Sequence, residues 1–271
     1  MPRMDAIVVG VGFAGTQHYL PILGKSEDFS VIGAVDPLGT ARERASNLCP
    51  GIWTVPTVQE IPDTAPRDAA VFVVTPTHYP VIAGLVKAGF RNLVVEKPLV
   101  SRAREVAELQ ELVVANALRI YAIDHYYQKF LPLEFVLGRM PWGDPRVASL
   151  AITGGHQPHE LPGCLGQVEG VTYTNIEAGD LGIPYLNDHP WVEQDPEIGG
   201  IIRDLGPHAF SPLVRNGLLG ALPDPFDIQL LRLSTDRTRY VPVMGEGEIE
   251  MYVHTLLVYN GVTVNLSLIH I

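Results

Sequence analysis

The 271-residue sequence has few cysteines, a deficit of positive charge and no long apolar run. Its 2 cysteines, Cys49 and Cys164, make a disulfide framework unexpected and favour a reducing, cytoplasmic compartment. The formal charge of −11 argues against nucleic acid or an anionic membrane as the main partner. No apolar stretch approaches the length of a membrane span, and the N-terminal residues do not have the layout of a signal peptide.

The chain does have enough apolar residues to bury more than one core. Hydrophobic residues make up 46% of it and charged residues 18%, which is typical of a globular enzyme. A chain of this length accommodates two domains. We expect a small-molecule enzyme or binding protein rather than a partner of nucleic acid.

Short apolar runs alternate with helical stretches in the first half of the chain, which indicates an α/β fold with a doubly wound parallel sheet. The expected strands are 6–10, 31–35, 69–74, 91–95 and 118–123, and the expected helices are 16–23, 38–48, 81–88 and 101–116, the last with Ser101 as its N-cap. We place a nucleotide-binding domain at 1–124 and a second, substrate-binding domain at 125–271.

A glycine-rich motif lies between the first expected strand and the first expected helix. In Gly10-Val-Gly12-Phe-Ala-Gly15, the first glycine permits a tight turn, the second lets the backbone approach a pyrophosphate, and the third lets helix and strand pack closely. Asp36 ends the second strand about 20 residues further on, where an acid binds the adenosine ribose of NAD and repels a 2′-phosphate. The predicted cofactor loop consists of Gly10, Gly12, Phe13, Ala14 and Gly15.

A charged segment ends the buried run Leu93–Val95. Glu96, Lys97 and Pro98 follow directly, at the end of a strand where open α/β sheets bind their ligands. We expect Lys97 to lie where cofactor and substrate meet, and Glu96 either to anchor the strand end or to orient Lys97.

The strand 69–74 also ends in polar residues, namely Thr75, Pro76 and, two positions later, His78. Two interpretations stand side by side. These residues line the cofactor, or they form a proline-rich turn that caps the helix 81–88.

These motifs, taken in order, resemble the glucose–fructose oxidoreductase/inositol dehydrogenase/MocA (Gfo/Idh/MocA) family. The residues that carry the resemblance are Gly10 to Gly15, Asp36, Thr75-Pro76, Glu96-Lys97-Pro98, Gly199-Gly200 and Asp204 to His208. The resemblance implies that Lys97 works beside the nicotinamide, that Lys97-Pro98 is a cis bond, and that Asp204 and His208 take part in catalysis.

A narrower resemblance, to glucose-6-phosphate dehydrogenases, covers Asp124-His125-Tyr126-Tyr-Gln-Lys129. It implies a sugar-phosphate pocket formed by His125, Tyr126 and Lys129, with Asp124 orienting the catalytic base. The alternative is that His125 and Tyr126 are satisfied polar residues at a domain junction and that Lys129 is solvated. Either Asp124 or Asp204 orients His208; the residues leave this open.

Two segments of the second half invite a closer interpretation. The stretch 156–190 shows no periodicity and is expected to be a long functional loop; its His156, His159, Glu160 and Cys164 fit no zinc-protease order, so no metal site is predicted. Asp204 and His208 are four residues apart, which is about one helical turn; because Pro207 is tolerated only in a first turn, the helix is expected either to begin near Gly206 or to be distorted.

Three strands are expected at 227–233, 248–259 and 262–271, the last two joined by a hairpin at Asn260-Gly261. They resemble the open, largely antiparallel second-domain sheet of the family, which often carries a subunit interface. Since relatives continue beyond this point, we expect a chain truncated at its C-terminus and a homo-oligomer in the full-length form.

The leading hypothesis is an oxidoreductase that uses NAD, with NADP not excluded, on a secondary alcohol of a sugar, cyclitol or sugar phosphate. His208 is the expected general base, because the pKa of imidazole is near neutral, and Lys97 stabilises charge on the substrate oxygen. The alternative is a sensor or regulator that binds NAD(P) without turnover. Retention of Lys97, Asp204 and His208 favours the enzyme.

Overall fold

The computed structural model describes residues 2–123, 169–177, 201–215, 228–236, 252–259 and 262–270. The chain divides into two compact units, Met1–Ile123 and Asp124–Ile271. Among the residues described, no helix is both long and apolar enough to span a membrane.

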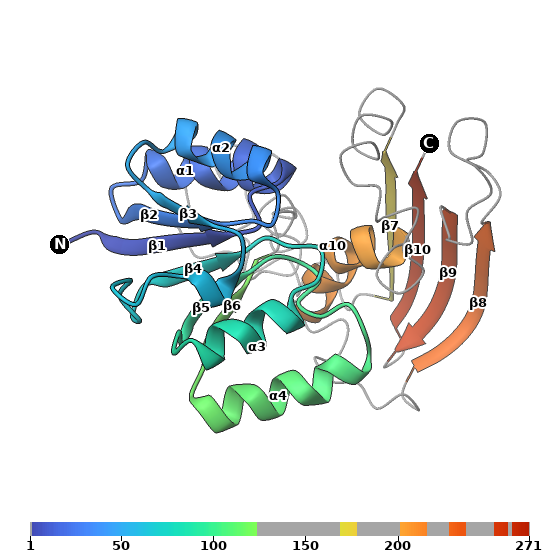
Figure 1. Ribbon diagram of the computed structural model, residues 1–271. Helices are drawn as coiled ribbons and strands as arrows, with labels where there is room; N and C mark the ends of the chain where they lie inside the picture. The colour runs from blue at the N-terminus through green and yellow to red at the C-terminus, as the bar shows by residue number, and fades with distance from the viewer. Residues whose placement is uncertain are drawn as a thin grey trace, which may run out of the picture. The chain divides into compact units, whose positions relative to one another are not determined.

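The first unit is a parallel six-stranded sheet with helices on both faces (Figure 1). Its strands are β1 (Met4–Val9), β2 (Phe29–Val35), β3 (Trp53–Val55), β4 (Ala70–Val73), β5 (Asn92–Val95) and β6 (Arg119–Ala122). Its helices are α1 (Leu20–Gly24), α2 (Gly39–Leu48), α3 (Tyr79–Lys87) and α4 (Arg104–Asn116), with a π-helical turn η1 (Gly15–Tyr19) and a 3₁₀ turn η2 (Val58–Glu60).

The strand order is β3-β2-β1-β4-β5-β6, and every neighbouring pair is parallel. This is the doubly wound order of dinucleotide-binding domains. The strands β2 and β3 extend the sheet on one side of β1, and β4, β5 and β6 extend it on the other side, so the strand order switches between β1 and β4. The predicted α/β class and its parallel sheet are confirmed for this unit.

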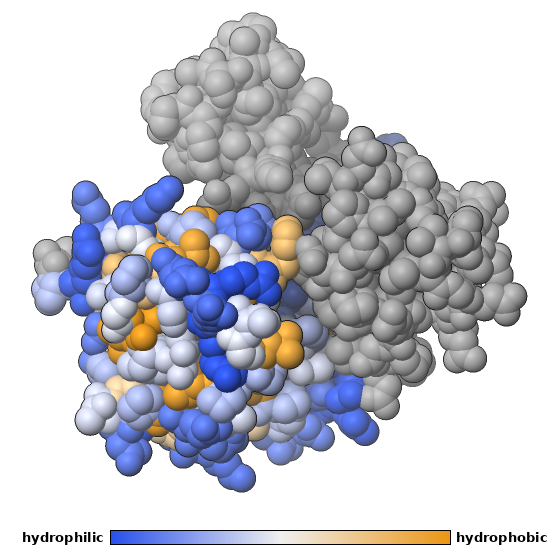
Figure 2. All heavy atoms as spheres, turned by 45° about the horizontal axis from the view of Figure 1, so that its top comes forward, coloured by the Kyte–Doolittle hydropathy of each residue, from blue (hydrophilic) through white to orange (hydrophobic). Residues whose placement is uncertain are grey.

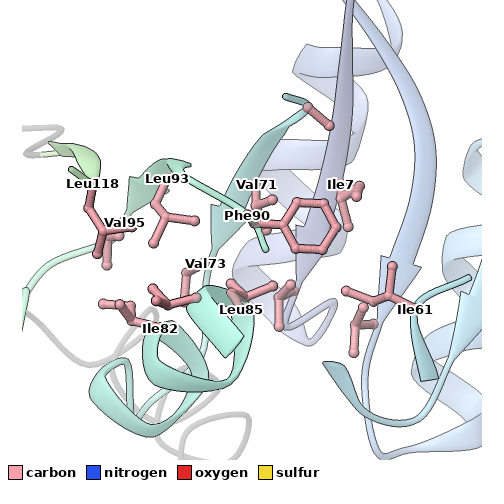
Figure 3. Packing of buried hydrophobic residues seen from close by; sticks show 14 of the residues in the cluster. Ile7, Ile61, Val71, Val73, Ile82, Leu85, Phe90, Leu93, Val95 and Leu118 are labelled. Carbon is pink, nitrogen blue, oxygen red and sulfur yellow. The ribbon is translucent and has the colours of Figure 1, made fainter. Parts of the chain in front are cut away.

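Two apolar clusters hold the sheet between its helices. Under α3 and α4, Phe90 is fully buried among strand residues such as Ile7 and Val71 and helix residues such as Leu85 (Figure 3). On the opposite face, Tyr19 and Leu20 pack with the small residues of α2. Because both faces are covered, the central strands are continuous apolar runs, and this is why the sequence revealed them so clearly.

The face seen in Figure 2 presents mainly hydrophilic side chains among the residues described, with apolar ones scattered between them. Isolated apolar side chains are ordinary on the surface of a globular domain.

Two short elements of the first unit were missed, and one expected helix has a different start. The edge strand β3 and the turn η2 were missed: β3 has three residues between Gly51 and Pro56, too few for a periodic signal, and exists through its pairing with β2. The helix expected at 16–23 begins earlier, at Phe13, and contains the π-helical turn η1 before α1.

Ser101 is not the N-cap of α4, whose first residue is Arg104. The serine hydroxyl donates instead to the Pro76 carbonyl, at 3.3 Å. The carboxylate of Glu105 accepts the backbone N–H groups of Ser101 (3.1 Å) and Arg102 (3.2 Å). An acid in the first turn of the helix therefore binds the backbone N–H groups of the two residues that precede its N-cap, Ala103.

The second unit has the helix α10 (Ile201–Arg215) and a four-stranded sheet of order β7-β10-β9-β8. Its strands are β7 (Gly170–Glu177), β8 (Ile228–Asp236), β9 (Tyr252–Tyr259) and β10 (Val262–His270). β9 pairs antiparallel with both β8 and β10, whereas β7 and β10 are parallel. The helix α10 packs against β9 and β10.

Two expectations for this unit need correction. The strand β7 lies within the segment 156–190 that was expected to be a loop, because its pairing with β10 supplies a partner that the local sequence does not reveal. The helix α10 begins at Ile201 rather than near Gly206 and continues through Pro207 and Pro212. The cost of the prolines is offset by packing, since Ala209 and Leu213 are buried.

The three C-terminal strands are present with shifted bounds, and Tyr259 pairs with Val262, as a two-residue hairpin loop requires. The hairpin residues Asn260-Gly261 lie outside the described residues, and so do a helix and a strand that the sequence also predicts at 131–137 and 147–153.

Candidate functional site

Four loops of the predicted site leave the same edge of the first unit's sheet. The glycine loop follows β1, Asp36 follows β2, Thr75 to His78 follow β4, and Glu96 to Pro98 follow β5. Because β1, β2, β4 and β5 are parallel neighbours, their carboxyl ends lie together at this edge.

The glycine loop has the geometry that the motif requires at Gly10 and Gly15. Gly10 adopts φ of +89°, and a Cβ there would strike the Val74 carbonyl. A Cβ on Gly15 would strike the carbonyl of Gly10, so the start of the helix lies directly against the strand end. No side-chain substitution fits either position without a shift of the backbone.

Gly12 differs from the other two glycines, because a Cβ built there meets no atom within 4 Å. Gly12 and Phe13 are exposed, between the buried Val11 and Gly15. This open stretch of backbone, at the start of a helix, fits a pyrophosphate, which binds close to the chain and to helix N–H groups. Ala14, half-buried, completes the loop.

Asp36 is buried, with 7% of its surface exposed, and both of its carboxylate oxygens are engaged. Oδ2 accepts the backbone N–H of Val11 at 2.9 Å, and Oδ1 accepts that of Leu38 at 2.9 Å. The carboxylate therefore joins the glycine loop to the start of α2. Arg42 donates to the carbonyls of Asp36 (2.6 Å) and Pro37 (2.9 Å), which holds the chain beyond β2.

The loop after β4 is bonded to the segment after β5. Thr75 donates its hydroxyl to the Thr77 carbonyl at 2.9 Å, and the Pro76 carbonyl accepts the Ser101 hydroxyl. His78 precedes α3 but makes no side-chain cap bond to it. Its Nδ1 lies 2.6 Å from the carbonyl oxygen of Pro98, so Nδ1 is the protonated nitrogen.

His78 is almost fully buried at 2% exposure, and its Nε2 has no hydrogen-bond partner among the described residues. Burial lowers the pKa of His78 below its usual 6.5, while the bond to Pro98 and the charge of Glu96 oppose that shift. The ring is therefore neutral near pH 7. The His78 side chain therefore does not cap α3. It bonds instead to Pro98, in the segment that carries Lys97.

The segment Glu96-Lys97-Pro98 is held by several bonds. The Lys97-Pro98 peptide bond is cis, as the family resemblance implied. Glu96 is buried at 8% exposure, and its Oε2 accepts the backbone N–H of Lys97 at 2.8 Å. Its Oε1 accepts the hydroxyl of Tyr19 at 2.6 Å. Lys97 itself is half-buried.

The residues predicted from the second half are only partly described. Asp204 and His208 both lie on α10, one turn apart along its backbone, and His208 is buried at 2% exposure. Asp124, His125, Tyr126 and Lys129 lie outside the described residues, so the choice between Asp124 and Asp204 as partner of His208 stays a prediction. Among the described residues there is no group of three or more metal-ligating side chains.

Sequence reasoning missed Tyr19, the donor to Glu96. A tyrosine inside an apolar helical stretch carries one usable signal, because a buried phenol almost always has a hydrogen-bond partner. The sequence does not say which partner, since Tyr19 and Glu96 are 77 residues apart.

The comparisons with known proteins agree with this geometry. Residues 4–124 match the profile of the Gfo/Idh/MocA oxidoreductase family, NAD-binding Rossmann fold. The structure resembles myo-inositol 2-dehydrogenase from Lactobacillus plantarum with a TM-score of 0.71 at 17% identity, over 99% of this chain and 70% of that one.

Two further solved structures resemble the chain at low identity. GenD2 from gentamicin A biosynthesis, in complex with NAD, has a TM-score of 0.65 at 21% identity, over 98% of this chain and 66% of that one. A variant of KijD10, a 3-ketoreductase from Actinomadura kijaniata, in complex with TDP-benzene and NADP, has a TM-score of 0.63 at 16% identity, over 98% of this chain and 68% of that one. At such identities these likenesses concern the fold. The glycine loop, the strand order and the family match together identify residues 4–124 as an NAD-binding Rossmann domain of the kind found in the Gfo/Idh/MocA oxidoreductase family.

Proposed function

We propose that the protein oxidises a secondary alcohol of a sugar, cyclitol or sugar phosphate, or reduces the corresponding carbonyl. The observation that carries this proposal is the fixed position of Lys97. Its backbone N–H binds Glu96, and the next residue, Pro98, accepts a bond from His78. A lysine held so firmly at the carboxyl edge of the sheet, near the glycine loop, suits a group that must meet a reacting atom accurately.

In this mechanism Lys97 donates a hydrogen bond to the substrate oxygen and stabilises the negative charge that develops there. His208 removes the hydroxyl proton as general base, and Asp204 or Asp124 orients its ring. Bound NAD would supply the acceptor for the hydride of the carbon that carries this hydroxyl. Transfer of the hydroxyl proton to His208 and loss of that hydride would together leave a carbonyl group in the product.

The binding roles follow from the same edge of the sheet. Gly10, Gly12, Phe13, Ala14 and Gly15 would hold the pyrophosphate, and Asp36 the adenosine ribose. Thr75, Pro76, His78 and Glu96 would support the nicotinamide side. The second unit, 125–271, would bind the substrate, with His125, Tyr126 and Lys129 receiving a phosphate or carboxylate.

The proposal extends to the setting of the protein. The chain would work in the cytoplasm, where its 2 cysteines stay reduced. It would form a homo-oligomer through the second-unit sheet.

The test is a spectrophotometric assay of the purified chain with NAD or NADP and a panel of sugars, cyclitols and their phosphates. We expect the absorbance at about 340 nm to change with at least one member, and NAD to be preferred because Asp36 repels a 2′-phosphate. Tight NAD binding with no redox change across the whole panel, in either direction, would instead identify a sensor that keeps the site without turnover.

A further inference from the structure

We propose that Tyr19 is a positioning residue that connects the dinucleotide loop to Lys97 through the carboxylate of Glu96. The inference rests on the proposed role of Lys97. It assigns a function to a phenol at the start of the cofactor-binding helix and to the carboxylate that precedes the lysine.

The contacts form a short chain of bonds. The Tyr19 hydroxyl donates to Glu96 Oε1 at 2.6 Å, and Glu96 Oε2 accepts the backbone N–H of Lys97 at 2.8 Å. The backbone N–H of Glu96 donates to the Val73 carbonyl at 3.0 Å, which continues the ladder between β4 and β5. One carboxylate thus fixes the backbone of the lysine, and one phenol fixes the carboxylate.

The surroundings keep this arrangement rigid. Tyr19 is buried at 7% exposure and Glu96 at 8%. The Tyr19 ring lies against that of Phe72, with centroids 6.2 Å apart, and Phe72 meets Phe29 edge to face at 5.5 Å. Burial, followed by the charge of Glu96 and the hydrogen bond to it, raises the pKa of Tyr19. The phenol therefore stays protonated and remains a donor.

The local helix geometry explains how a residue just after the cofactor loop reaches this position. Tyr19 is the last residue of η1, the π-helical turn that begins at Gly15 of the glycine motif. A π-helical turn changes the direction in which the following side chains point, and such turns are frequent at functional sites. The turn begins where a pyrophosphate is expected and ends at the phenol that holds Glu96.

The experiment compares three variants of the full chain with the native protein: Tyr19→Phe, Glu96→Gln and the double variant. Tyr19→Phe removes only the hydroxyl and keeps the ring that packs on Phe72. The matched control is Tyr121→Phe on β6, which removes a phenol from a side chain that is 70% exposed. Turnover, the Kd of NAD and the exchange rate of the Lys97 amide hydrogen are measured for each.

We expect Tyr19→Phe to lower kcat about five- to tenfold, because a lost hydrogen bond to a buried charge leaves that charge poorly held. The Kd of NAD should stay within about twofold, and the Lys97 amide should exchange about five- to tenfold faster. The double variant should be no worse than Glu96→Gln alone, since both changes break one chain of bonds. Tyr121→Phe should change none of these quantities.

The amide measurement separates this inference from the proposed function. Unchanged Lys97 exchange and unchanged kcat in Tyr19→Phe would overturn the inference, even if Lys97→Ala is inactive. Full turnover in Lys97→Ala would overturn the catalytic role of the lysine, while faster exchange in Tyr19→Phe would still establish that the phenol holds its backbone. Strictly additive effects of the two substitutions would also contradict a connection through Glu96.

Discussion

Asp36 and Glu96 are both buried carboxylates at the carboxyl edge of one parallel sheet, and they differ in what they bind. Asp36 accepts two backbone N–H groups, from Val11 and Leu38. Glu96 accepts one backbone N–H, from Lys97, and one side-chain hydroxyl, from Tyr19. The first acid depends on the main chain alone, whereas the second depends on the identity of another residue.

This difference indicates two separate roles at the carboxyl edge of the sheet, one in binding the cofactor and one in holding Lys97. An acid that binds backbone fixes the shape of a loop, and here it joins the glycine loop to the start of α2, which suits the binding of an adenosine ribose. An acid that binds a distant phenol connects two segments, and here it connects the cofactor loop to the strand that carries Lys97. The comparison predicts that changes at Asp36 affect cofactor affinity and that changes at Glu96 affect turnover.

The largest contrast is expected from a pair of isosteric substitutions, Asp36→Asn and Glu96→Gln. Asp36→Asn should raise the Kd of NAD about ten- to a hundredfold, because the asparagine oxygen can accept only one of the two backbone N–H groups and its NH₂ group faces the other; it should also reduce the preference for NAD over NADP. Glu96→Gln should lower kcat and leave the Kd of NAD within about twofold. Titration of intrinsic fluorescence with NAD, together with steady-state kinetics, measures both. Equal losses of affinity in the two variants would break the comparison.

The glycine loop supplies a second test on the Asp36 side of the edge, through Gly15→Ala and Gly12→Ala. Gly15→Ala should lower the free energy of unfolding by about 1–3 kcal/mol, because its methyl group would strike the Gly10 carbonyl. Gly12→Ala meets no atom and should leave stability unchanged, while it weakens NAD binding by crowding the pyrophosphate. Denaturant unfolding and NAD titration distinguish the two; a stable Gly15→Ala protein would contradict the close packing of helix and strand.

The smallest expected effect is a pH dependence of stability that comes from His78, which bonds to the segment following Glu96. Its pKa is lowered by burial, so below the usual value of 6.5 the unfolded chain binds a proton that the folded chain does not. Stability is therefore complete above that value and falls as the pH drops from it towards the lowered pKa, by no more than about 1.4 kcal/mol per pH unit.

The control for this effect is His78→Asn, whose side-chain N–H can still reach the Pro98 carbonyl but does not titrate. Thermal unfolding between pH 7 and about pH 5 should show a steeper loss for the native protein than for this variant. The same slope in both would show that His78 is not held neutral. His78→Leu, which lacks the donor, should also lower kcat, and His78→Asn should restore it.

Much of the first unit could be predicted from the sequence because its signals are local. Buried parallel strands are continuous apolar runs, and Gly10, Gly12 and Gly15 have roles that follow from their neighbours in the chain. The predicted acid Asp36 lies at the end of β2, as expected. The three-residue strand β3 and the strand β7 could not be found in this way, because each exists through pairing with a strand elsewhere in the chain.

The site could also be predicted only in part: its central residue was found, but the contacts that hold it were not. The charged end of β5 drew attention to Lys97, but the contacts that hold it come from Tyr19, 77 residues before its partner Glu96, and from His78, 20 residues before Pro98. A single sequence carries no record of such pairs. The π-helical turn that brings Tyr19 into place has no simple sequence signature either, and Ser101, a good N-cap by composition, bonds instead to Pro76.

The central claim, that Lys97 is the residue at which cofactor and substrate meet, is tested most directly by Lys97→Ala. The measurement is kcat with NAD and the best substrate of the panel, with the Kd of NAD determined in parallel. We predict a loss of about 10²–10³-fold in kcat, as for removal of a donor to a developing oxyanion, with NAD affinity nearly unchanged. Turnover at the native rate in Lys97→Ala would contradict the account.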